Sequence, residues 1–530
     1  MFTKGLLTAL AVQSCVAAVS KARDEHASCT KTTVAILGGG MAGVAAAQAL
    51  HNSSIDDFVI IEYRDTLGGR VAHTDFGKDE NGKPYTVELG ANWVCGARIG
   101  LAGGPENPIW TFAKKWNLNN TYSNYSSILT YDENGFNDYA SMLDEFEDMY
   151  DEASEQAGIL LKENLQDQTA RTGLALAGWR PKIDDMKAQA VEWWEWDWED
   201  AYSPEESSFI FGAAGENLTF NQFSDANNYV WDQRGYNHLI KGEASTFLKK
   251  NDPRLQLNSI ITNVTYTDSG VTIHKKDGSC VQAAYAVCTF SLGVLQNNAV
   301  SFSPKLPYWK RTAIEKFSMG TYTKIFLQFN ETFWPRDTQY FLYADPTTRG
   351  YYPVWQSLSA PGFLPESNVI FVTVVSQEAY RIERQSDEET KAEVMKVLRD
   401  MYPEKDIPDP IAFMYPRWTT TPWAHGSYSN WPPSTTLEMH ENLRANVNRL
   451  WFAGEATSAQ YFGFLHGAWF EGQDAGEQIA KLLKDECKNV SDTSVDCGDR
   501  RYYDTLHGSS PLADYSVFDG WEVSSFYSSS

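Results

Sequence analysis

Cysteine is scarce in this chain of 530 residues: there are seven cysteines, and none of them has the spacing of zinc ligands. A fold framed by disulfides is therefore excluded, and disulfide bonds are expected only as accessories to a hydrophobic core. Cys487 and Cys497 are close together in a polar terminal stretch, so they are the pair expected to form a bridge. No metal site is predicted.

Basic residues are also scarce, because 44 lysines and arginines stand against 69 aspartates and glutamates, giving a formal net charge of −25. This balance argues against a nucleic-acid-binding surface, since such surfaces are basic. A negative field raises the local concentration of cationic ligands. Solubility alone is the other explanation of the charge, and the sequence leaves both open.

Long apolar runs are absent after residue 20, so no membrane span is expected. Residues 1–20 combine Lys4, an apolar stretch and small residues at the end, which is typical of a secretory signal peptide. Removing them deletes only Lys4 among the charges and takes −25 to −26. Seven Asn-x-Ser/Thr sequons agree with a secreted, extracellular or cell-wall protein: Asn52, Asn119, Asn124, Asn217, Asn263, Asn330 and Asn489.

Residues 34–70 show the pattern of a strand, a glycine turn, a helix and a second strand ending in an acid. In such a unit Gly38 allows the tight turn, Gly40 lets the backbone approach a pyrophosphate, and Gly43 lets the helix pack on the strand. Glu62 follows at the distance from which an acid binds a ribose 2′-hydroxyl. The pattern predicts a dinucleotide site.

The length of the chain predicts two closely joined domains of mixed α/β class. A Rossmann-like domain is expected from residues 30–123, 232–312 and 424–486, with a small antiparallel sheet in its second part. A substrate domain of mixed sheet and helices is expected from residues 124–231 and 313–423. Residues 498–530 are rich in Tyr and Ser, show no periodicity and are expected to be a loosely held extension.

Several motifs recur in order along residues 32–485: Gly-Gly-Gly-Met-Ala-Gly43, Leu-Gly-Gly-Arg70, Glu-Leu-Gly-Ala-Asn-Trp-Val94, Asp-Gln-Arg-Gly-Tyr236, Ser-Leu-Gly-Val-Leu295, Tyr-Thr-Lys-Ile-Phe326, Ser-Asn-Trp-Pro432, Phe-Ala-Gly-Glu455 and His-Gly-Ala468. Together they resemble the flavin-containing amine oxidases, and among these the secreted polyamine oxidases. The resemblance covers nearly all of the chain that follows the predicted signal peptide.

The resemblance implies FAD as the cofactor. Glu62 is expected to hold the adenosine ribose, Arg70 to approach the pyrophosphate, and Ile261 to meet the adenine through its backbone. Glu455 is expected at the ribityl or phosphate region, with a helix-capping role as the alternative. A helix beginning near residues 464–467 would direct its positive end at the flavin pyrimidine. The implied cofactor residues are Gly38, Gly40, Met41, Ala42, Gly43, Glu62, Gly69, Arg70, Gly90, Ala91, Asn92, Trp93, Ile261, Gly454, Glu455 and Phe464.

The mode of flavin attachment is expected to be non-covalent. Residues 426–428 correspond to the stretch in which monoamine oxidases attach their flavin through a cysteine, and no cysteine stands there.

Lys324 lies in the middle of a predicted strand, and its spacing alone would place it facing solvent. The resemblance instead implies that it binds a water against flavin N5 and assists reoxidation by O2 or hydrolysis of the imine. Tyr428 and Phe464 resemble the two aromatic walls beside the flavin, with Trp93 and Tyr322 as second choices. An aromatic enclosure disfavours a charged amine, and hydride leaves the carbon only when the nitrogen is neutral. As the alternative, either ring is ordinary core.

Two positions depart from the polyamine oxidases that this chain resembles. Cys95 stands where a glutamate lines the tunnel, and Tyr202 stands where a second acid is expected. Glu199 is close enough to substitute, as are Asp200, Glu205 and Glu206. The Trp-rich stretch 192–200 could supply acids and cation–π surfaces for a distal ammonium. A solvated helix face is the alternative for that stretch, and a small apolar wall residue is the expectation for Cys95.

The function expected from the resemblance is amine oxidation that yields H2O2 and an imine, which hydrolyses to aldehyde and amine. Polyamines or their acetylated forms are the favoured substrates. An oxidase of an aromatic or specialised amine is the first alternative, because it would better explain Cys95 and Phe464. A catalytically silent flavoprotein that binds ligands is the second. The expected partners are the amine and O2; the oligomeric state stays open, with a monomer favoured.

Overall fold

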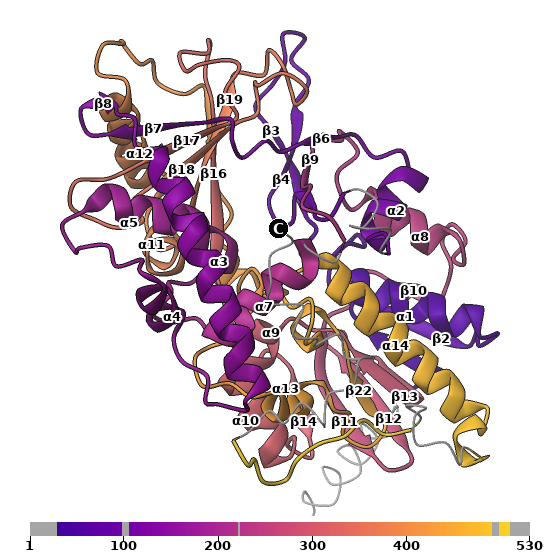
Figure 1. Ribbon diagram of the computed structural model, residues 1–530. Helices are drawn as coiled ribbons and strands as arrows, with labels where there is room; N and C mark the ends of the chain where they lie inside the picture. The colour runs from indigo at the N-terminus through magenta and orange to yellow at the C-terminus, as the bar shows by residue number, and fades with distance from the viewer. Residues whose placement is uncertain (1–28, 98–104, 221–222, 490–497, 509–530) are drawn as a thin grey trace, which may run out of the picture.

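The computed structural model describes residues 29–97, 105–220, 223–489 and 498–508, and Figure 1 shows their arrangement. The predicted signal peptide, 1–20, lies outside these residues. Within the described ranges, no helix is both long and apolar enough to cross a membrane.

The first of two large sheets has eight strands in the order β10-β2-β1-β13-β12-β11-β14, with β22 beside β13. It is parallel around β1 and antiparallel where β12 lies between β11 and β13, so the predicted antiparallel section joins the dinucleotide sheet. The strands are β1 (Thr30–Leu37), β2 (Phe58–Ile61), β10 (Leu255–Gln256), β11 (Ile261–Thr267), β12 (Gly270–Lys275), β13 (Cys280–Cys288), β14 (Ser301–Ser303) and β22 (Leu450–Phe452).

The second large sheet has seven strands in the order β20-β16-β19-β18-β17-β7-β8, and it lies in the upper part of Figure 1. Every residue of β16 and β19 is buried, because strands cover both edges of each and other elements cover both faces. The strands are β7 (Ile128–Asp132), β8 (Gly135–Phe136), β16 (Tyr322–Gln328), β17 (Tyr340–Tyr343), β18 (Val354–Ser357), β19 (Val369–Val375) and β20 (Ala412–Met414).

Three smaller sheets have the strand orders β3-β4, β5-β9-β6 and β15-β21. Their strands carry residues that later prove to line a cavity, such as Trp93 in β5 and Ser429 in β21. The strands are β3 (His73–Phe76), β4 (Tyr85–Glu88), β5 (Trp93–Val94), β6 (Asn120–Tyr122), β9 (Asn228–Val230), β15 (Ser318–Met319) and β21 (Ser429–Asn430).

Helices α1 and α14 lie side by side against the eight-stranded sheet (Figure 1). The two helices pack closely at Gly472, which has no side chain: a Cβ atom there would lie only 2.2 Å from the carbonyl oxygen of Ala42. The α-helices are α1 (Met41–Asn52), α2 (Pro108–Lys115), α3 (Ser141–Lys162), α4 (Ala170–Ala177), α5 (Met186–Glu192), α6 (Trp198–Asp200), α7 (Phe209–Phe220), α8 (His238–Ser245), α9 (Leu292–Gln296), α10 (Tyr308–Lys316), α11 (Ser376–Ile382), α12 (Asp387–Met401), α13 (Leu437–Arg444) and α14 (Leu465–Leu483). The other helical turns are the π-helix η2 (Trp193–Asp197) and the 3-10 turns η3 (Trp418–Thr420), η4 (Glu455–Thr457) and η5 (Glu486–Asn489).

A disulfide joins Cys29 to Cys280, next to the first pair of the β1–β13 ladder. The sequence had not indicated this bond, because its two cysteines are 251 residues apart. Cys487 also takes part in a disulfide. Its predicted partner, Cys497, lies outside the described residues, so that pairing stays a prediction.

The prediction that residues 498–530 are loosely held is wrong for residues 498–508, because these residues form hydrogen bonds with side chains and backbone of the fold. The remainder, 509–530, lies outside the described residues.

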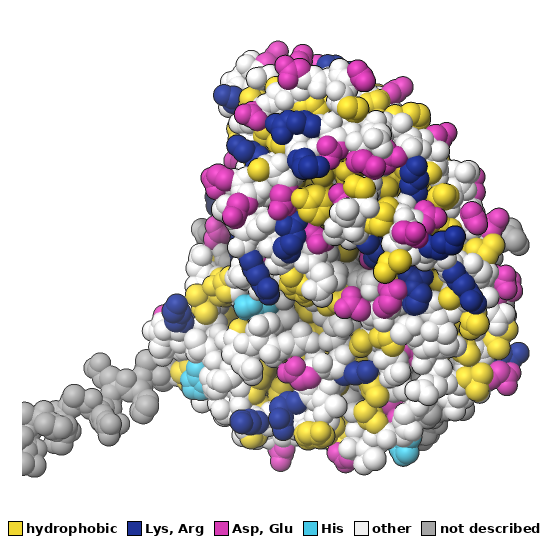
Figure 2. All heavy atoms as spheres, turned by 90° about the vertical axis from the view of Figure 1, so that its left-hand side faces the viewer, with side chains coloured by type: hydrophobic (Ala, Val, Ile, Leu, Met, Phe, Trp, Pro, Cys, Tyr) yellow, Lys and Arg dark blue, Asp and Glu magenta, His cyan; other side chains and the backbone are white. Residues whose placement is uncertain are grey.

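The face of the molecule shown in Figure 2 carries acidic side chains scattered among lysines and arginines. The negative charge is therefore not gathered into one patch on this face.

Candidate active site

A cavity of about 500 Å³ runs between the glycine turn after β1 and an aromatic enclosure near β5, β16 and α14. It brings together nearly all of the predicted site residues, although they come from positions more than 400 residues apart. The predicted residues that line it are Gly38, Gly40, Met41, Ala42, Glu62, Gly69, Arg70, Gly90, Ala91, Asn92, Trp93, Cys95, Glu199, Ile261, Tyr322, Tyr428, Gly454, Glu455 and Phe464.

The glycine turn at one end of the cavity has the geometry of a dinucleotide site. Gly38 has a φ of +121°, a conformation that favours glycine, and Gly40 is the N-cap of α1. Because Gly40 has no side chain, it cannot satisfy the first N–H groups of the helix, and these suit a phosphate. Gly43 does not line the cavity; a Cβ there would lie 2.0 Å from the carbonyl oxygen of Gly38, so it serves the close packing of helix on strand.

Glu62 is held at the end of β2 by two backbone donors. Its Oε2 accepts from the N–H of Gly39 at 2.6 Å, and its Oε1 accepts from the N–H of Arg64 at 2.7 Å. Burial raises the pKa of this carboxyl, although the two hydrogen bonds oppose the rise. The carboxyl is thus fixed where a ribose is expected.

Arg70 and Glu455 form an ion pair across the cavity, with 2.7 Å between Nη1 and Oε1. Arg70 also donates to the carbonyl oxygen of Ser427 at 2.9 Å. The second oxygen of Glu455 accepts from the Ser429 hydroxyl at 2.6 Å and from the Gly463 N–H at 2.9 Å. Glu455 therefore links the segment after β22 to β21 and to the loop before α14.

Lys324 is buried in the middle of β16, so the expectation from its spacing alone, a solvent-facing lysine, is wrong. Its Nζ donates to the carbonyl oxygen of Gly90 at 2.6 Å and to Oδ1 of Asn92 at 2.5 Å, and lies 5.9 Å from the centre of the Trp93 ring. Burial lowers the pKa of Lys324 to about 7. Lys324 lies directly behind the cavity lining that Gly90 and Asn92 provide, and its amine can exchange a proton near neutral pH.

Glu88 is a buried acid that the sequence analysis missed, although it begins the Glu-Leu-Gly-Ala motif. Its Oε1 accepts from the N–H of Tyr236 at 2.6 Å, and the Tyr236 hydroxyl donates to the carbonyl oxygen of Trp93 at 2.9 Å. Burial raises the pKa of Glu88 to about 7, and its negative charge raises the pKa of Lys324 against the effect of burial. Glu88 thus anchors the loop that holds Lys324 and influences the charge of that lysine.

We expect Glu88→Gln to shift the pH dependence of any step that needs the neutral Lys324 amine toward lower pH. Without the carboxylate the ammonium loses a stabilising charge, so the pKa of Lys324 falls. The measurement is the pH profile of flavin reduction and of reoxidation. Glu80→Gln, on the exposed end of the same β3–β4 hairpin, is the matched control and should leave the profile unchanged.

Aromatic rings enclose the other end of the cavity. The rings of Tyr322 and Tyr428 have their centres 6.0 Å apart, and Trp93 lies edge-on to Trp198 at 5.4 Å. Phe464, the N-cap of α14, completes the lining, so α14 begins at the cavity. Among the lining rings that the sequence analysis did not name individually are Tyr125 and Trp198.

The Trp-rich stretch 192–200 is neither an ordinary amphipathic helix nor a solvated one. Helix α5 continues into the π-helix η2 and then α6, and a π-helix inside an α-helix frequently marks a functional site. Two of its acids, Glu192 and Asp197, are buried and paired with Arg349 at 2.9 and 2.6 Å, and Glu192 also pairs with Arg171, so the two negative charges are neutralised away from the cavity. The part of the stretch that lines the cavity is Trp198, Glu199 and Asp200.

Glu199 lies beside the aromatic enclosure. Its backbone carbonyl accepts from the Tyr428 hydroxyl at 2.6 Å. Its negative charge contributes to raising the pKa of four lining groups, Cys95, Tyr125, Tyr322 and Tyr428, in each of which burial is the largest cause. The charge of Glu199 therefore affects the pKa of several groups that line this end of the cavity.

Comparisons with known proteins identify the family. The model of the family described as flavin containing amine oxidoreductase matches residues 41–480. The chain belongs to this family. It is 38% identical to polyamine oxidase 1 of Zea mays over 90% of this chain and 97% of that protein. It is 36% identical to polyamine oxidase 7 of Oryza sativa subsp. japonica, over 83% of this chain and 93% of that protein.

The fold is also that of solved amine oxidase structures. A putrescine oxidase bound to putrescine matches with a TM-score of 0.64 and 18% identity, covering 86% of this chain and 99% of that chain. The predicted mixed α/β architecture is confirmed. The family implies FAD, and the uncapped α1 N-terminus, the fixed Glu62 and the Arg70–Glu455 pair fit such a dinucleotide.

Cys95 and Tyr202, the two predicted substrate contacts that depart from the polyamine oxidases, have different places in this flavin oxidase. Cys95 lines the cavity, and burial, which is the larger cause, together with Glu199 raises the pKa of its thiol, so it is a neutral wall residue. Tyr202 is not among the described residues that line the cavity, and its hydroxyl donates to the carbonyl oxygen of Met319 at 3.1 Å. The cavity lining therefore contains Cys95 and Glu199, but not Tyr202.

Proposed function

We propose that this protein is a secreted oxidase of polyamines or their acetylated forms, with non-covalently bound FAD. The observation that carries the proposal is the combination of three features at one cavity: an aromatic enclosure, the neighbouring acids Glu199 and Asp200 in its lining, and the buried amine of Lys324 behind that lining. FAD, when bound, supplies the hydride acceptor and is reoxidised by O2 to give H2O2.

The cofactor would lie along the cavity from Glu62 to Phe464. The N–H groups at the start of α1 and Arg70 would bind the pyrophosphate, and Glu62 the adenosine ribose. Ile261 lines the adenine end, and Gly454 with Glu455 the ribityl region. We assign residues 30–123, 232–312 and 424–486 to FAD binding and residues 124–231 and 313–423 to substrate binding.

The carbon next to the substrate nitrogen would be oxidised between Tyr428 and Phe464. Their low-polarity surroundings favour the neutral amine, whose lone pair is needed for hydride loss. Lys324, with a pKa of about 7, would hold or release a proton at Nζ from behind the lining that Gly90 and Asn92 provide, and would act on the imine or the reduced flavin through a water. A second ammonium of the substrate would be bound by the carboxylate of Glu199 and by the face of Trp198.

The curated relatives support polyamines, since two plant proteins at 36–38% identity are named polyamine oxidases. A competing substrate class, an aromatic or specialised amine, is favoured by one observation: the neutral Cys95 thiol makes this wall less acidic. The Glu199 carboxylate weighs against that class, because a monoamine offers no second charge.

Secretion is supported by the disulfide between Cys29 and Cys280, since such bonds persist in oxidising compartments. Four of the predicted sequon asparagines are exposed on the surface, which glycosylation requires: Asn52, Asn119, Asn124 and Asn330. By contrast, Asn263 uses its side-chain amide to donate to Ser301 Oγ at 2.8 Å.

The test is anaerobic mixing of the purified protein with spermine, spermidine, their N-acetyl forms, monoamines and aromatic amines, followed by the absorbance of oxidised flavin. Bleaching by polyamines that air reverses with release of peroxide supports the proposal. Bleaching only by other amines moves the assignment to the competing class. Binding without any bleaching would make the protein a silent flavoprotein. Flavin retained on the denatured chain after acid precipitation would contradict non-covalent attachment.

A further inference from the structure

Residues 498–508 return to the flavin-binding half of the molecule and dock along α10, α13 and α14. The ring of Tyr502 stacks on Trp309 with centres 4.5 Å apart. The backbone N–H of Tyr503 donates to Oδ1 of Asn442 at 2.7 Å, and its carbonyl oxygen accepts from Nδ2 of the same side chain at 2.9 Å. His507 bonds to both oxygens of Glu438 through its N–H and Nδ1. We call this segment the C-terminal strap.

Arg500 is the one side chain of the strap that reaches the core, where it is 4% exposed. Its Nη1 donates to the carbonyl oxygen of Phe452 at 2.9 Å and to that of Arg444 at 3.2 Å. Its Nη2 is bonded to Asp474. Arg500 therefore joins the end of β22, the end of α13 and the third turn of α14.

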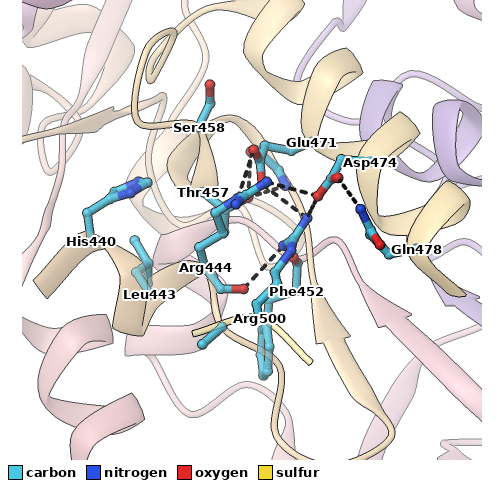
Figure 3. A network of polar contacts seen from close by, with 12 residues as sticks. His440, Leu443, Arg444, Phe452, Thr457, Ser458, Glu471, Asp474, Gln478 and Arg500 are labelled. Carbon is cyan, nitrogen blue, oxygen red and sulfur yellow. Dashed lines mark hydrogen bonds and ion pairs between the residues drawn. The ribbon is translucent and has the colours of Figure 1, made fainter. Parts of the chain in front are cut away.

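Figure 3 shows that Arg500 and Arg444 converge on the carboxylates of Glu471 and Asp474. Arg444 donates from Nε to both oxygens of Glu471 at 3.0 and 3.1 Å, and from Nη2 to Asp474 at 2.8 Å. Burial raises the pKa of Asp474, but the two arginines outweigh it and lower the pKa to about 2. Two cations and two anions thus compensate one another, and removing one leaves an uncompensated charge.

The elements that Arg500 joins are those that frame the flavin end of the cavity. The chain passes from Phe452 in β22 directly to Gly454 and Glu455, both of which line it. Helix α14 carries Asp474 and also the lining residues Leu465 and Ala468 in its first turn. A shift of α14 against β22 would therefore separate Glu455 from the loop at Gly463, whose N–H it accepts at 2.9 Å.

We propose that Arg500 is a positioning residue for the cofactor: from the C-terminal strap it fixes α14 against the end of β22, and so keeps the flavin site closed around FAD. The inference rests on the flavin site assigned above. The strap lies outside residues 41–480, the region that the family model matches, so membership of the family does not by itself suggest that the strap helps to retain the cofactor.

The experiment compares wild-type holoprotein with Arg500→Gln, and with Arg501→Gln as the matched control on the exposed neighbouring position. FAD affinity is measured by titrating the apoprotein with FAD and following flavin fluorescence. For Arg500→Gln the Kd is expected to rise about tenfold, the size of losing one strong charge-assisted hydrogen bond. Amide exchange of α14 in the apoprotein should become faster, and Arg501→Gln should change neither quantity.

A second variant, Tyr502→Ala, weakens the docking of the strap on α10 without touching the network in Figure 3. It should lower the melting temperature and leave the Kd for FAD within about twofold of wild type, because its contact lies away from α14. A Kd for Arg500→Gln equal to that of wild type, with only a lower melting temperature, would overturn the inference. Absence of FAD binding by the wild-type protein would instead refute the flavin site itself.

Discussion

Lys324→Met is expected to slow turnover about 100- to 1000-fold while leaving the flavin spectrum and the melting temperature near those of wild type. The reason is that Nζ of Lys324 is the titratable group directly behind the cavity, with a pKa of about 7 set by burial and Glu88. Methionine keeps the length and the apolar stem, so β16 can stay packed, but it can neither donate to Gly90 and Asn92 nor move a proton.

Stopped-flow measurement separates the two half-reactions. If Lys324 acts on reoxidation or on the imine, anaerobic bleaching by substrate should be affected less than the return of the oxidised spectrum in air. An equal loss in both would indicate that Lys324 also takes part in hydride loss. Turnover close to that of wild type would contradict a role for Lys324 in the chemistry.

Glu199→Gln is expected to raise KM for spermidine about 10- to 100-fold with a smaller change in kcat, because a hydrogen bond to a charged group contributes about 1.5–3 kcal/mol. Its charge reaches Cys95, Tyr322 and Tyr428, so its carboxylate is the anion best placed for a second ammonium. The same substitution should change KM little for a monoamine, which has no second charge to lose.

The matched control for Glu199→Gln is Glu206→Gln. Glu206 is an exposed acid in the loop that follows, and it is not one of the described residues that line the cavity. It should leave KM unchanged for every amine. A KM for spermidine that Glu199→Gln leaves unaltered would show that the second ammonium is bound elsewhere or not at all. Equal effects on spermidine and a monoamine would point to disturbed packing around Tyr428 instead.

Local patterns in the sequence were sufficient for the glycine turn and the elements around it. The alternation of strand, glycines and helix predicted β1, α1 and β2, because glycine conformation and hydrophobic period depend on neighbouring residues only. The start of α12 is likewise fixed by neighbouring residues, through a capping box between Ser386 and Glu389. Motifs that resemble the family then indicated the lining residues, including Tyr428 and Phe464.

The environment of Lys324 could not be read from its spacing, because burial depends on strands β19 and β20, which lie far along the chain. The same holds for the acids of the Trp-rich stretch. Glu192 and Asp197 pair with Arg349, more than 150 residues away, whereas Glu199, which follows the π-helix, lines the cavity.

By itself, then, the sequence determined the family, the dinucleotide turn and the identity of most residues around the cavity, since each is carried by short motifs whose geometry is local. Only the tertiary structure decided which charges act there. The coupling of Glu88 to Lys324, the disulfide between Cys29 and Cys280 and the return of Arg500 to α14 all depend on contacts between distant segments. Electrostatic effects and burial belong to such contacts, and no local pattern specifies them.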